Sequence, residues 1–336
     1  MDFKNGTATF VMPHWRDENN ITKKYLDETL ATIFNQTDSN WQLVIVDDMS
    51  PCKEAVDYLD EVKAKHPEKI HIIKKTTNDG PGHCRNLGIR WAYENKSPFV
   101  AFLDADDLSD PKRIEVARKI FVSNPEASVV YSTFKVIDEN SNLVPDNKLS
   151  PSIIEITDGH KHNPPQGPNA WIEIGTEKGY TNLTSATVVK TDLAFKYPFP
   201  AEKVSEDSHA WMRYSSGGKS FVYTPEIPTL YRIPQNTAGS SSRSREGGKS
   251  GFYRAKARVD IDGFSRAIEI AITNGKIMVE QRDELMIKFL LKLADTIQQE
   301  QEIEIMREIV AQADRMNKAV TDQIIQERGY SSWARK

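Results

Sequence analysis

The chain has 336 residues, of which 38% are hydrophobic and 27% are charged, which is typical of globular proteins and unlike disordered or fibrous chains. Its 44 basic and 48 acidic side chains give a formal net charge of −4, which argues against a general nucleic-acid binder. No apolar run reaches the roughly 18 to 20 residues of a membrane span, and the N-terminus lacks a leader pattern, so we expect a cytoplasmic protein. Cys52 and Cys84 lack the spacing of a disulfide framework or a zinc site.

Short β-rich apolar runs alternate with helical patterns through the first half of the chain. The runs cover residues 7–12, 41–47, 70–74, 99–103 and 128–134. Between the first two, apolar residues recur at helical spacing over 21–34, as expected for a helix with one face on a sheet. Strands that alternate with helices predict an α/β fold, with a mostly parallel sheet flanked by helices.

Another helix is predicted to begin at Asp110-Pro111, because aspartate commonly caps helices and proline suits the first helical position. Asp110 is therefore expected to be structural. The stretch over 140–180 is rich in Pro, Asn and Gly, which predicts irregular connections over a site.

The composition changes near residue 240. Residues 239–251 contain nine Gly or Ser among thirteen, which favours a mobile loop, and the pattern after it is helical. We therefore predict an α/β domain over 1–238, a mobile basic loop over 239–258 and a helical C-terminal region over 259–336. The apolar stripes beyond residue 280 indicate helix packing, and they would also suit a subunit interface of a homo-oligomer.

Two of the predicted strands end in carboxylates. The strand at 99–103 is followed by Asp104, Asp106 and Asp107, and the strand at 41–47 ends in Asp47 and Asp48. In an open parallel sheet, ligands gather at the carboxyl ends of strands, where acids can hold a divalent cation beside phosphate oxygens. The alternative for both groups is a solvated turn with Asp as a local cap.

A Gly/Pro turn from Gly80 leads into a helix that carries Arg85 in its first turns. A helix start with a nearby cation can approach a nucleotide, although an ordinary turn before a helix has the same composition.

These motifs together resemble the family 2 glycosyltransferases of the GT-A fold, which are inverting, nucleotide-sugar-dependent enzymes. The resemblance covers about residues 5–235. The runs that carry it are FVMPHW from Phe10, WQLVIVDDMS from Trp41, GPGHCRNLG from Gly80 and FLDADD from Phe102. It implies a nucleotide-binding half over about 1–135 and an acceptor half over about 136–238.

The resemblance implies that one group of residues binds the nucleoside. Pro13, His14 and Trp15 would line its pocket, and Asp47 or Asp48 would contact the base. The family usually has a small or hydroxyl residue and then an aromatic-Asn pair after the first proline, where this chain has His-Trp-Arg.

The resemblance also implies a diphosphate and metal site. Arg85 would face the nucleotide, and Asp104 with Asp106 would form the Asp-x-Asp motif that binds Mn²⁺ or Mg²⁺. We expect Asp106 to be the direct metal ligand and Asp104 to contact the nucleotide as well.

A fifth run, VSEDSHAWMR from Val204, resembles the Glu-Asp motif of the family, in which the aspartate is the catalytic base. Asp207 would take the proton of the acceptor hydroxyl as it attacks the anomeric carbon opposite the leaving diphosphate. His209 is a rival base by its ordinary pKa, but it would point elsewhere on a helix. Glu206 and Trp211 are expected to contact the acceptor, with a solvated helix-start acid and a core aromatic as the alternatives.

The Gly/Ser loop carries cations at Arg243 and Arg245, and more cations follow up to residue 258. They would close over the donor and stabilise the charge of the leaving diphosphate, or they would form a solvated basic linker. A contact with a membrane surface would use the same charges.

We expect an inverting glycosyltransferase that moves a sugar from a nucleotide diphosphate donor, a UDP-sugar by resemblance, to a hydroxyl group of a glycan, lipid-linked or polymer acceptor. The resemblance implies bacterial surface polysaccharide or glycoconjugate synthesis, in the cytoplasm or peripherally at the inner face of the membrane. The alternative is a non-catalytic nucleotide- or carbohydrate-binding module with a helical interaction tail. A sugar nucleotidyltransferase ranks below both, because the first strand lacks a Gly-rich triphosphate loop.

Overall fold

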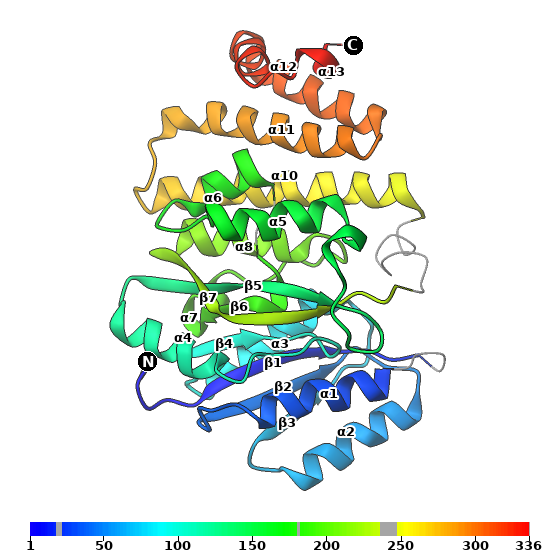
Figure 1. Cartoon of the computed structure of the whole chain (residues 1–336). Helices are drawn as coiled ribbons and strands as arrows, with labels where there is room; N and C mark the ends of the chain where they lie inside the picture. Colours follow the sequence, from blue (N-terminus) through cyan, green and yellow to red (C-terminus); the bar gives the residue numbers. More distant parts are fainter. Residues whose placement is uncertain (18–21, 180–181, 236–246, 336) are drawn as a thin grey trace.

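The computed structural model describes residues 1–17, 22–179, 182–235 and 247–335 (Figure 1). Seven strands form one sheet in the order β3-β2-β1-β4-β6-β5-β7. The strands are β1 (Ala8–His14), β2 (Trp41–Asp47), β3 (Ile70–Lys74), β4 (Phe99–Phe102), β5 (Ala127–Ile137), β6 (Thr187–Lys190) and β7 (Ser220–Arg232). Only β6 runs antiparallel to its neighbours in this described sheet, so the predicted mostly parallel α/β fold is confirmed.

Helices cover both faces of the sheet because successive strand residues point to opposite sides. The flanking helices are α1 (Thr22–Phe34), α2 (Lys53–Lys65), α3 (Pro81–Glu94), α4 (Arg113–Ser123), α7 (Thr191–Lys196) and α8 (Glu206–Gly217). Phe10 of β1 belongs to the core under α1, α2 and α4. Its neighbour Val11 belongs to the core under α3, α7 and α8.

Two local predictions need correction. Helix α4 begins at Arg113, because Asp110 accepts a 2.8 Å hydrogen bond from the backbone N–H of Lys112 and forms a turn there. The 140–180 stretch is largely helical, since Ser150 caps a regular helix by accepting from the N–H of Ile153. Its elements are η1 (Asp146–Lys148), α5 (Pro151–His162), α6 (Ala170–Glu173) and the π-helix η2 (Ile174–Lys178), and η3 (Thr184–Ala186) follows.

The C-terminal region is helical, as predicted, and it forms a core of its own. Figure 1 shows α10, α11 and α12 stacked in succession beyond α8. The elements are α10 (Lys249–Thr273), η4 (Val279–Gln281), α11 (Arg282–Gln299), α12 (Ile303–Glu327) and α13 (Ser331–Ala334). Their apolar stripes pack together with Trp171 and Met212, which joins this region to α6 and α8. No helix among the described residues is long and apolar enough to cross a bilayer.

Residues 249–258 of the predicted mobile loop lie in α10, and residues 239–246 lie outside the described part of the chain. The Gly/Ser-rich composition continues into the first turn of α10. Local helix propensity is low there, so the tertiary contacts of the segment decide that it is helical.

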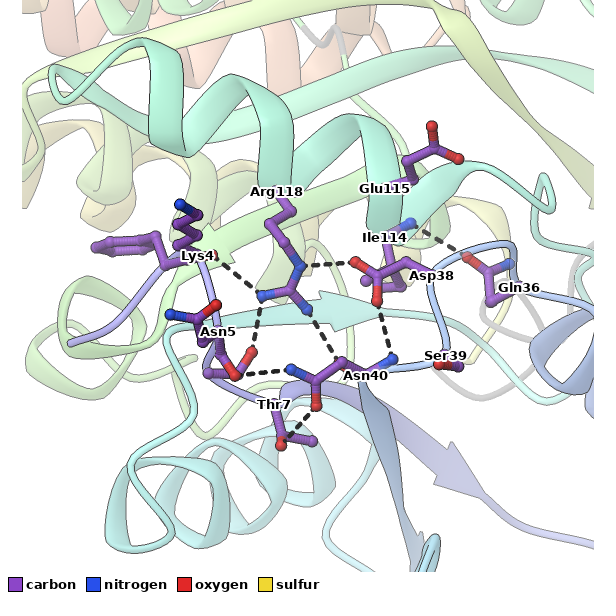
Figure 2. A network of polar contacts seen from close by, with 12 residues as sticks. Lys4, Asn5, Thr7, Gln36, Asp38, Ser39, Asn40, Ile114, Glu115 and Arg118 are labelled. Carbon is purple, nitrogen blue, oxygen red and sulfur yellow. Dashed lines mark hydrogen bonds and ion pairs between the residues drawn. The ribbon is translucent and has the colours of Figure 1, made fainter.

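A polar network fastens the amino ends of β1 and β2 (Figure 2). The guanidinium of Arg118 donates to Asp38 at 2.6 Å and to the carbonyls of Phe3, Gly6 and Asn40 at 3.1, 2.7 and 3.0 Å. These contacts lie at the end of the strands opposite to the predicted site, so the network stabilises the fold.

Candidate active site

The site lies at the carboxyl ends of β1, β2 and β4. The strand order is β3-β2-β1-β4, so the chain builds β2 and β3 on one side of β1 and then places β4 on the other side. The order of the strands reverses between β1 and β4, and α/β sheets bind ligands at such a switch point. The register places His14 beside Asp47 and Val11 beside Phe102, so Asp104 follows β4 at the same edge.

His14 and Asp47 form a buried pair at this edge. The Nδ1 atom of His14 lies 2.8 Å from Oδ1 of Asp47, and both side chains are 3% exposed. Ser50 donates to the same carboxylate from its hydroxyl at 2.5 Å and from its N–H at 3.0 Å. Burial raises the pKa of Asp47, but the hydrogen bonds from His14 and Ser50 outweigh it, so the pKa lies below its ordinary value. Asp47 therefore orients His14 as a carboxylate.

Asp48 holds the turn before α3. It accepts from the backbone N–H of Asp79 at 3.1 Å and of Gly80 at 2.8 Å, and from the ammonium of Lys75. Our sequence reasoning did not include Lys75 among the candidate site residues. Its side chain is 5% exposed, and the available signal was its position just after β3, beside the acidic end of β2.

The other predicted nucleoside residues differ in exposure. Pro13 is half-buried within β1 beside Val46, and Trp15, just beyond the strand, is 36% exposed. Met49 follows β2, is 52% exposed and has a left-handed backbone with φ of 59°. Accessible apolar surface thus lies next to the buried His14 and Asp47 pair.

Arg85 connects the two acidic motifs of the site. Its Nη2 donates to Asp104 at 2.7 Å and its Nη1 donates to Glu206 at 2.8 Å, while the side chain is only 4% exposed. The structure shows Arg85 bonded to these two carboxylates, and the expected contact of Arg85 with the nucleotide stays a prediction. One guanidinium thus brings the Asp-x-Asp run and the Glu-Asp run together.

Helix α3 also fixes the segment that leads into α8. Asn86 exchanges two hydrogen bonds with the backbone of Phe199, at 2.9 and 2.8 Å. A Cβ on Gly82 would lie 3.1 Å from Cγ of Glu206 and 3.3 Å from the carbonyl of Pro200. The glycine therefore permits the close approach that places Glu206 against Arg85.

The acids after β4 differ in their partners. Arg85 pairs with Asp104, whereas no Lys, Arg or His in the described chain forms an ion pair with Asp106. Burial, then the charge of Asp104, raises the pKa of Asp106 to about 6. Burial, then the charges of Asp106 and Asp104, raises the pKa of Asp107 well above its ordinary value, and its Oδ2 atom has no hydrogen-bond partner.

This concentration of negative charge fits a divalent cation. The described residues contain no group of three or more His, Cys, Asp or Glu side chains arranged to hold a metal ion. A cation bound through one or two carboxylates and completed by substrate phosphates suits this arrangement, because Mg²⁺ commonly binds in that way. Of the two acids of the Asp-x-Asp motif, Asp104 pairs with Arg85 and Asp106 does not.

Arg232 holds the acidic loop in place. Its N–H donates to Oδ1 of Asp107 at 2.9 Å and its Nε to the carbonyl of Asp106 at 2.8 Å. The same side chain pairs with Glu28 of α1 at 2.7 Å. We predicted no specific role for Arg232, since Asp106 and Asp107 lie more than 120 positions away from it in the chain.

Glu206 and Asp207 begin α8. Glu206 is 8% exposed, and burial, followed by the charge of Asp207, raises its pKa to about 7. Asp207 accepts from the hydroxyl of Thr184 at 3.3 Å and from the N–H of Ser208 at 2.8 Å. Through Arg85, the start of α8 therefore lies beside the acidic motif after β4.

Of the two predictions about ring side chains on α8, the one for His209 agrees with the structure and the one for Trp211 does not. His209 is buried, with Nε2 2.8 Å from Asp262 of α10, which agrees with the expectation that it packs away from the site. Trp211 is 1% exposed, and its ring centroid lies 5.9 Å from that of Phe102 and 5.7 Å from that of Tyr214. Trp211 is thus a core residue, and the predicted stacking on an acceptor sugar is wrong because no face of the ring is accessible.

The cations of the predicted lid are divided between two parts of the chain. Arg243 and Arg245 lie outside the described residues, so their role stays a prediction. Those that follow lie on α10, where Lys256 pairs with an acid of the same helix and the other three pair with acids from other segments. The pairs are Lys249 with Glu300, Arg254 with Glu308, Lys256 with Asp260, and Arg258 with Glu202.

The fold is that of solved GT-A glycosyltransferases. TarS of S. aureus, residues 1–349, in complex with UDP-GlcNAc, aligns with a TM-score of 0.53 at 16% identity, covering 96% of this chain and 92% of that one. The mannosyltransferase PcManGT from Pyrobaculum calidifontis, in complex with GDP-Man and Mn²⁺, aligns with a TM-score of 0.55 at 16% identity, covering 98% and 83%.

The sequence comparisons identify the family. The model of the family described as Glycosyl transferase family 2 matches residues 9–182, just over half of the chain. An uncharacterized glycosyltransferase of Methanocaldococcus jannaschii is 27% identical over 238 residues, which cover 70% of this chain and 75% of that protein. The chain belongs to glycosyl transferase family 2 and is a glycosyltransferase.

Proposed function

We propose that the enzyme transfers a sugar from a nucleotide diphosphate donor, a UDP-sugar in the first instance, to a hydroxyl group with inversion at the anomeric carbon. The observation that carries the proposal is the position of Arg85 between Asp104 and Glu206. It brings the acids expected at the diphosphate next to the acids expected at the acceptor. The UDP-GlcNAc bound by TarS and the GDP-Man bound by PcManGT support a nucleotide-sugar donor.

The carboxylate of Asp207 serves as the base in this proposal. It takes the proton of the acceptor hydroxyl as the oxygen forms its bond to the anomeric carbon, and the bond from that carbon to the diphosphate oxygen breaks. Glu206 keeps Arg85 in position beside this reaction. Attack from the side opposite the leaving group produces inversion.

Asp106, with Asp104, would hold a divalent cation, Mn²⁺ or Mg²⁺. Such a cation, when bound, neutralises the charge of the diphosphate. Arg85 adds positive charge at the same place and keeps Asp104 oriented. His14, Trp15 and the pair Asp47 and Asp48 are the proposed nucleoside subsite, in which Asp47 acts through His14 and Asp48 through the turn before α3.

The test is the release of nucleoside diphosphate from a panel of UDP- and GDP-sugars, with and without Mn²⁺. Metal-dependent release from one donor is expected from the native chain. Asp106→Ala is expected to weaken donor binding and release, and Asp207→Asn to abolish transfer while donor binding persists.

Matched controls are available on the same kinds of element. Asp110→Ala removes an acid four positions beyond Asp106 that only caps a turn, and Asp192→Asn alters an acid in the first turn of α7. Both controls are expected to retain native turnover. Full activity of a folded Asp207→Asn enzyme would show that another group is the base. Absence of nucleotide binding by the native chain would contradict the proposed donor.

The acceptor remains a hydroxyl group of a glycan, lipid-linked or polymer substrate in this proposal. A role in surface polysaccharide or glycoconjugate synthesis, at the inner face of a membrane, agrees with that acceptor class. Saturation of release by an added acceptor, measured across these three classes, identifies the class.

A further inference from the structure

The first helix of the C-terminal region is bonded to the segment that carries the Glu206-Asp207 pair. Three side chains of α10 reach it within one and a half turns. The contacts are Arg258 to Glu202 at 2.7 Å, Asp260 to the Ser205 hydroxyl at 2.6 Å, and Asp262 to His209 at 2.8 Å. The segment therefore has polar partners on α10 on both sides of the acid pair.

Ser205 has an unusual conformation for its position. It is the N-cap residue of α8, and its backbone is left-handed with φ of 58° and ψ of 19°. Left-handed backbone is unfavourable for any residue with a Cβ, so the surroundings must hold it. A serine at an N-cap normally accepts a hydrogen bond from the N–H groups of the first helical turn. Ser205 makes no such bond. Its hydroxyl donates to Asp260 and accepts from Lys256, both on α10.

Asp260 is well placed to hold this serine. It is 4% exposed, and its second oxygen accepts from the ammonium of Lys256 at 2.6 Å, which also donates to the Ser205 hydroxyl at 3.3 Å. Serine, aspartate and lysine thus form a closed triangle of hydrogen bonds between two helices. A buried acid that is bonded in this way keeps a defined geometry.

The two helices also approach closely one turn further along. A Cβ on Gly263 would lie 2.9 Å from both Cα and Cγ of His209, so α10 contacts the backbone of α8 there. His209 is 2% exposed and bonds Asp262 from this contact. The position of α8 relative to α10 is therefore set by steric contact as well as by hydrogen bonds.

We propose that Asp260 of α10, with Lys256, is a positioning residue for the glycosyl transfer. It holds Ser205 in its left-handed conformation, and that conformation sets the direction in which the next two residues, Glu206 and Asp207, project into the site. The C-terminal helical region is then part of the catalytic unit. This inference rests on the proposed role of Asp207 as base.

The decisive variants are Asp260→Ala and Ser205→Gly. Glycine adopts the left-handed conformation without strain, so Ser205→Gly removes the hydroxyl and leaves the backbone allowed. Both variants are expected to lower kcat by about tenfold or more, because a misplaced reacting group is costly, while the Kd for UDP changes less than about twofold. The double variant is expected to be no worse than either single one, since the two residues act through one bond.

Arg258→Gln is the matched control. It removes a contact from the same helix to the same segment, but at Glu202, and its side chain is 64% exposed. Native kcat is expected for this control. A kcat for Asp260→Ala and Ser205→Gly equal to that of the native enzyme would overturn the inference.

A second measurement does not depend on activity. Hydrogen exchange of the backbone amides of residues 206–209 is expected to accelerate in Asp260→Ala and to stay native in Arg258→Gln. Unchanged exchange in Asp260→Ala would contradict the inference by itself. If the native chain releases no nucleoside diphosphate from any donor, the proposed function fails, and this exchange measurement still decides whether Asp260 holds the start of α8.

Discussion

Arg85 and Glu206 lie 121 positions apart in the chain, yet the guanidinium of Arg85 donates a 2.8 Å hydrogen bond to the carboxylate of Glu206. The other arm of the same guanidinium binds Asp104 at 2.7 Å. Burial, followed by the charge of Asp207, raises the pKa of Glu206 to about 7, so the cation lies beside an acid that is costly to ionise. Arg85 is therefore a buried cation that joins two of the acidic motifs of the site.

Replacing Arg85 by Met is expected to destabilise the protein by about 3–5 kcal/mol, because it leaves two partly buried carboxylates without their cation. Arg85→Lys keeps a charge but cannot reach both acids in the fork geometry, so it is expected to lose turnover by more than about tenfold. Urea unfolding and initial rates measure the two effects. Arg90→Met, an exposed cation on the same helix, is the control and should be close to native.

Two adjacent lysines should differ strongly in their effect on stability. Lys75 and its partner Asp48 are 5% and 6% exposed, so Lys75→Met is expected to cost about 3–5 kcal/mol in unfolding free energy. Lys74 pairs with Asp60, and the two side chains are 38% and 58% exposed, so Lys74→Met is expected to cost about 1 kcal/mol or less. Equal midpoints of urea unfolding for both variants would contradict the importance of the buried pair.

Replacing two helical glycines by alanine is expected to change thermal stability in opposite directions. A Cβ on Gly88 of α3 would lie 2.5 Å from Cγ1 of Val11 in β1, so Gly88→Ala should force helix and sheet apart and lower the Tm by several degrees. A Cβ on Gly159 of α5 meets no atom within 4 Å, so Gly159→Ala should gain about 0.5–1 kcal/mol from helix propensity. Calorimetry of the two variants checks the signs, and a stable Gly88→Ala would show that α3 can shift away from β1.

The pair of His209 and Asp262 is expected to make the free energy of unfolding depend on pH. Burial, then the charge of Arg213, lowers the pKa of His209 and outweighs the hydrogen bond with Asp262. The unfolded chain therefore binds this proton more readily than the folded chain, and stability is lost as the pH falls below about 6.5. The pKa of Asp262 is also lowered, because hydrogen bonds from Arg266 and His209 outweigh burial, so it acts in the same direction at lower pH.

The test compares the slope of unfolding free energy against pH between 7.5 and 5. His209→Gln should flatten the slope relative to the native chain, because the variant has no titrating ring at this contact. His162→Gln, whose native side chain is 75% exposed, should leave the slope unchanged. Parallel slopes for native and His209→Gln would mean that other groups govern this range.

Much of the fold up to about residue 135 was predictable because its signals are local. The strands at 41–47 and 70–74 have the predicted bounds, since an apolar run bounded by turns needs no knowledge of distant residues. The positions of Asp47 and Asp104 at one edge follow from the rule that parallel strands point the same way. The start of α4 was missed by two residues. An aspartate caps a turn and a helix by the same kind of hydrogen bond, and Asp110 caps a turn here.

Contacts between distant segments were not predictable from the sequence. A guanidinium pairs with whichever carboxylate the fold brings within reach, and nothing local distinguishes Arg85, which joins two acids, from an arginine that faces a phosphate. A tryptophan such as Trp211 suits stacking on a sugar and packing in a core equally well. Only the packing of α8 on the sheet shows that it is buried. The segment from residue 249 has the composition of a loop, but it is the start of α10. Acids of other segments pair with Arg254 and Arg258 there.

The sequence by itself determined the alternation of strands and helices up to about residue 135, the helical character of the C-terminal region, the kinds of side chain at the strand ends and the family, because hydrophobic periodicity and short motifs are properties of neighbouring residues. Only the tertiary structure decided that Arg85 joins Asp104 to Glu206 and that Asp260 holds Ser205 at the start of α8. Those bonds join residues 19, 121 and 55 positions apart, and their partners are selected by how the helices pack on the sheet and on each other.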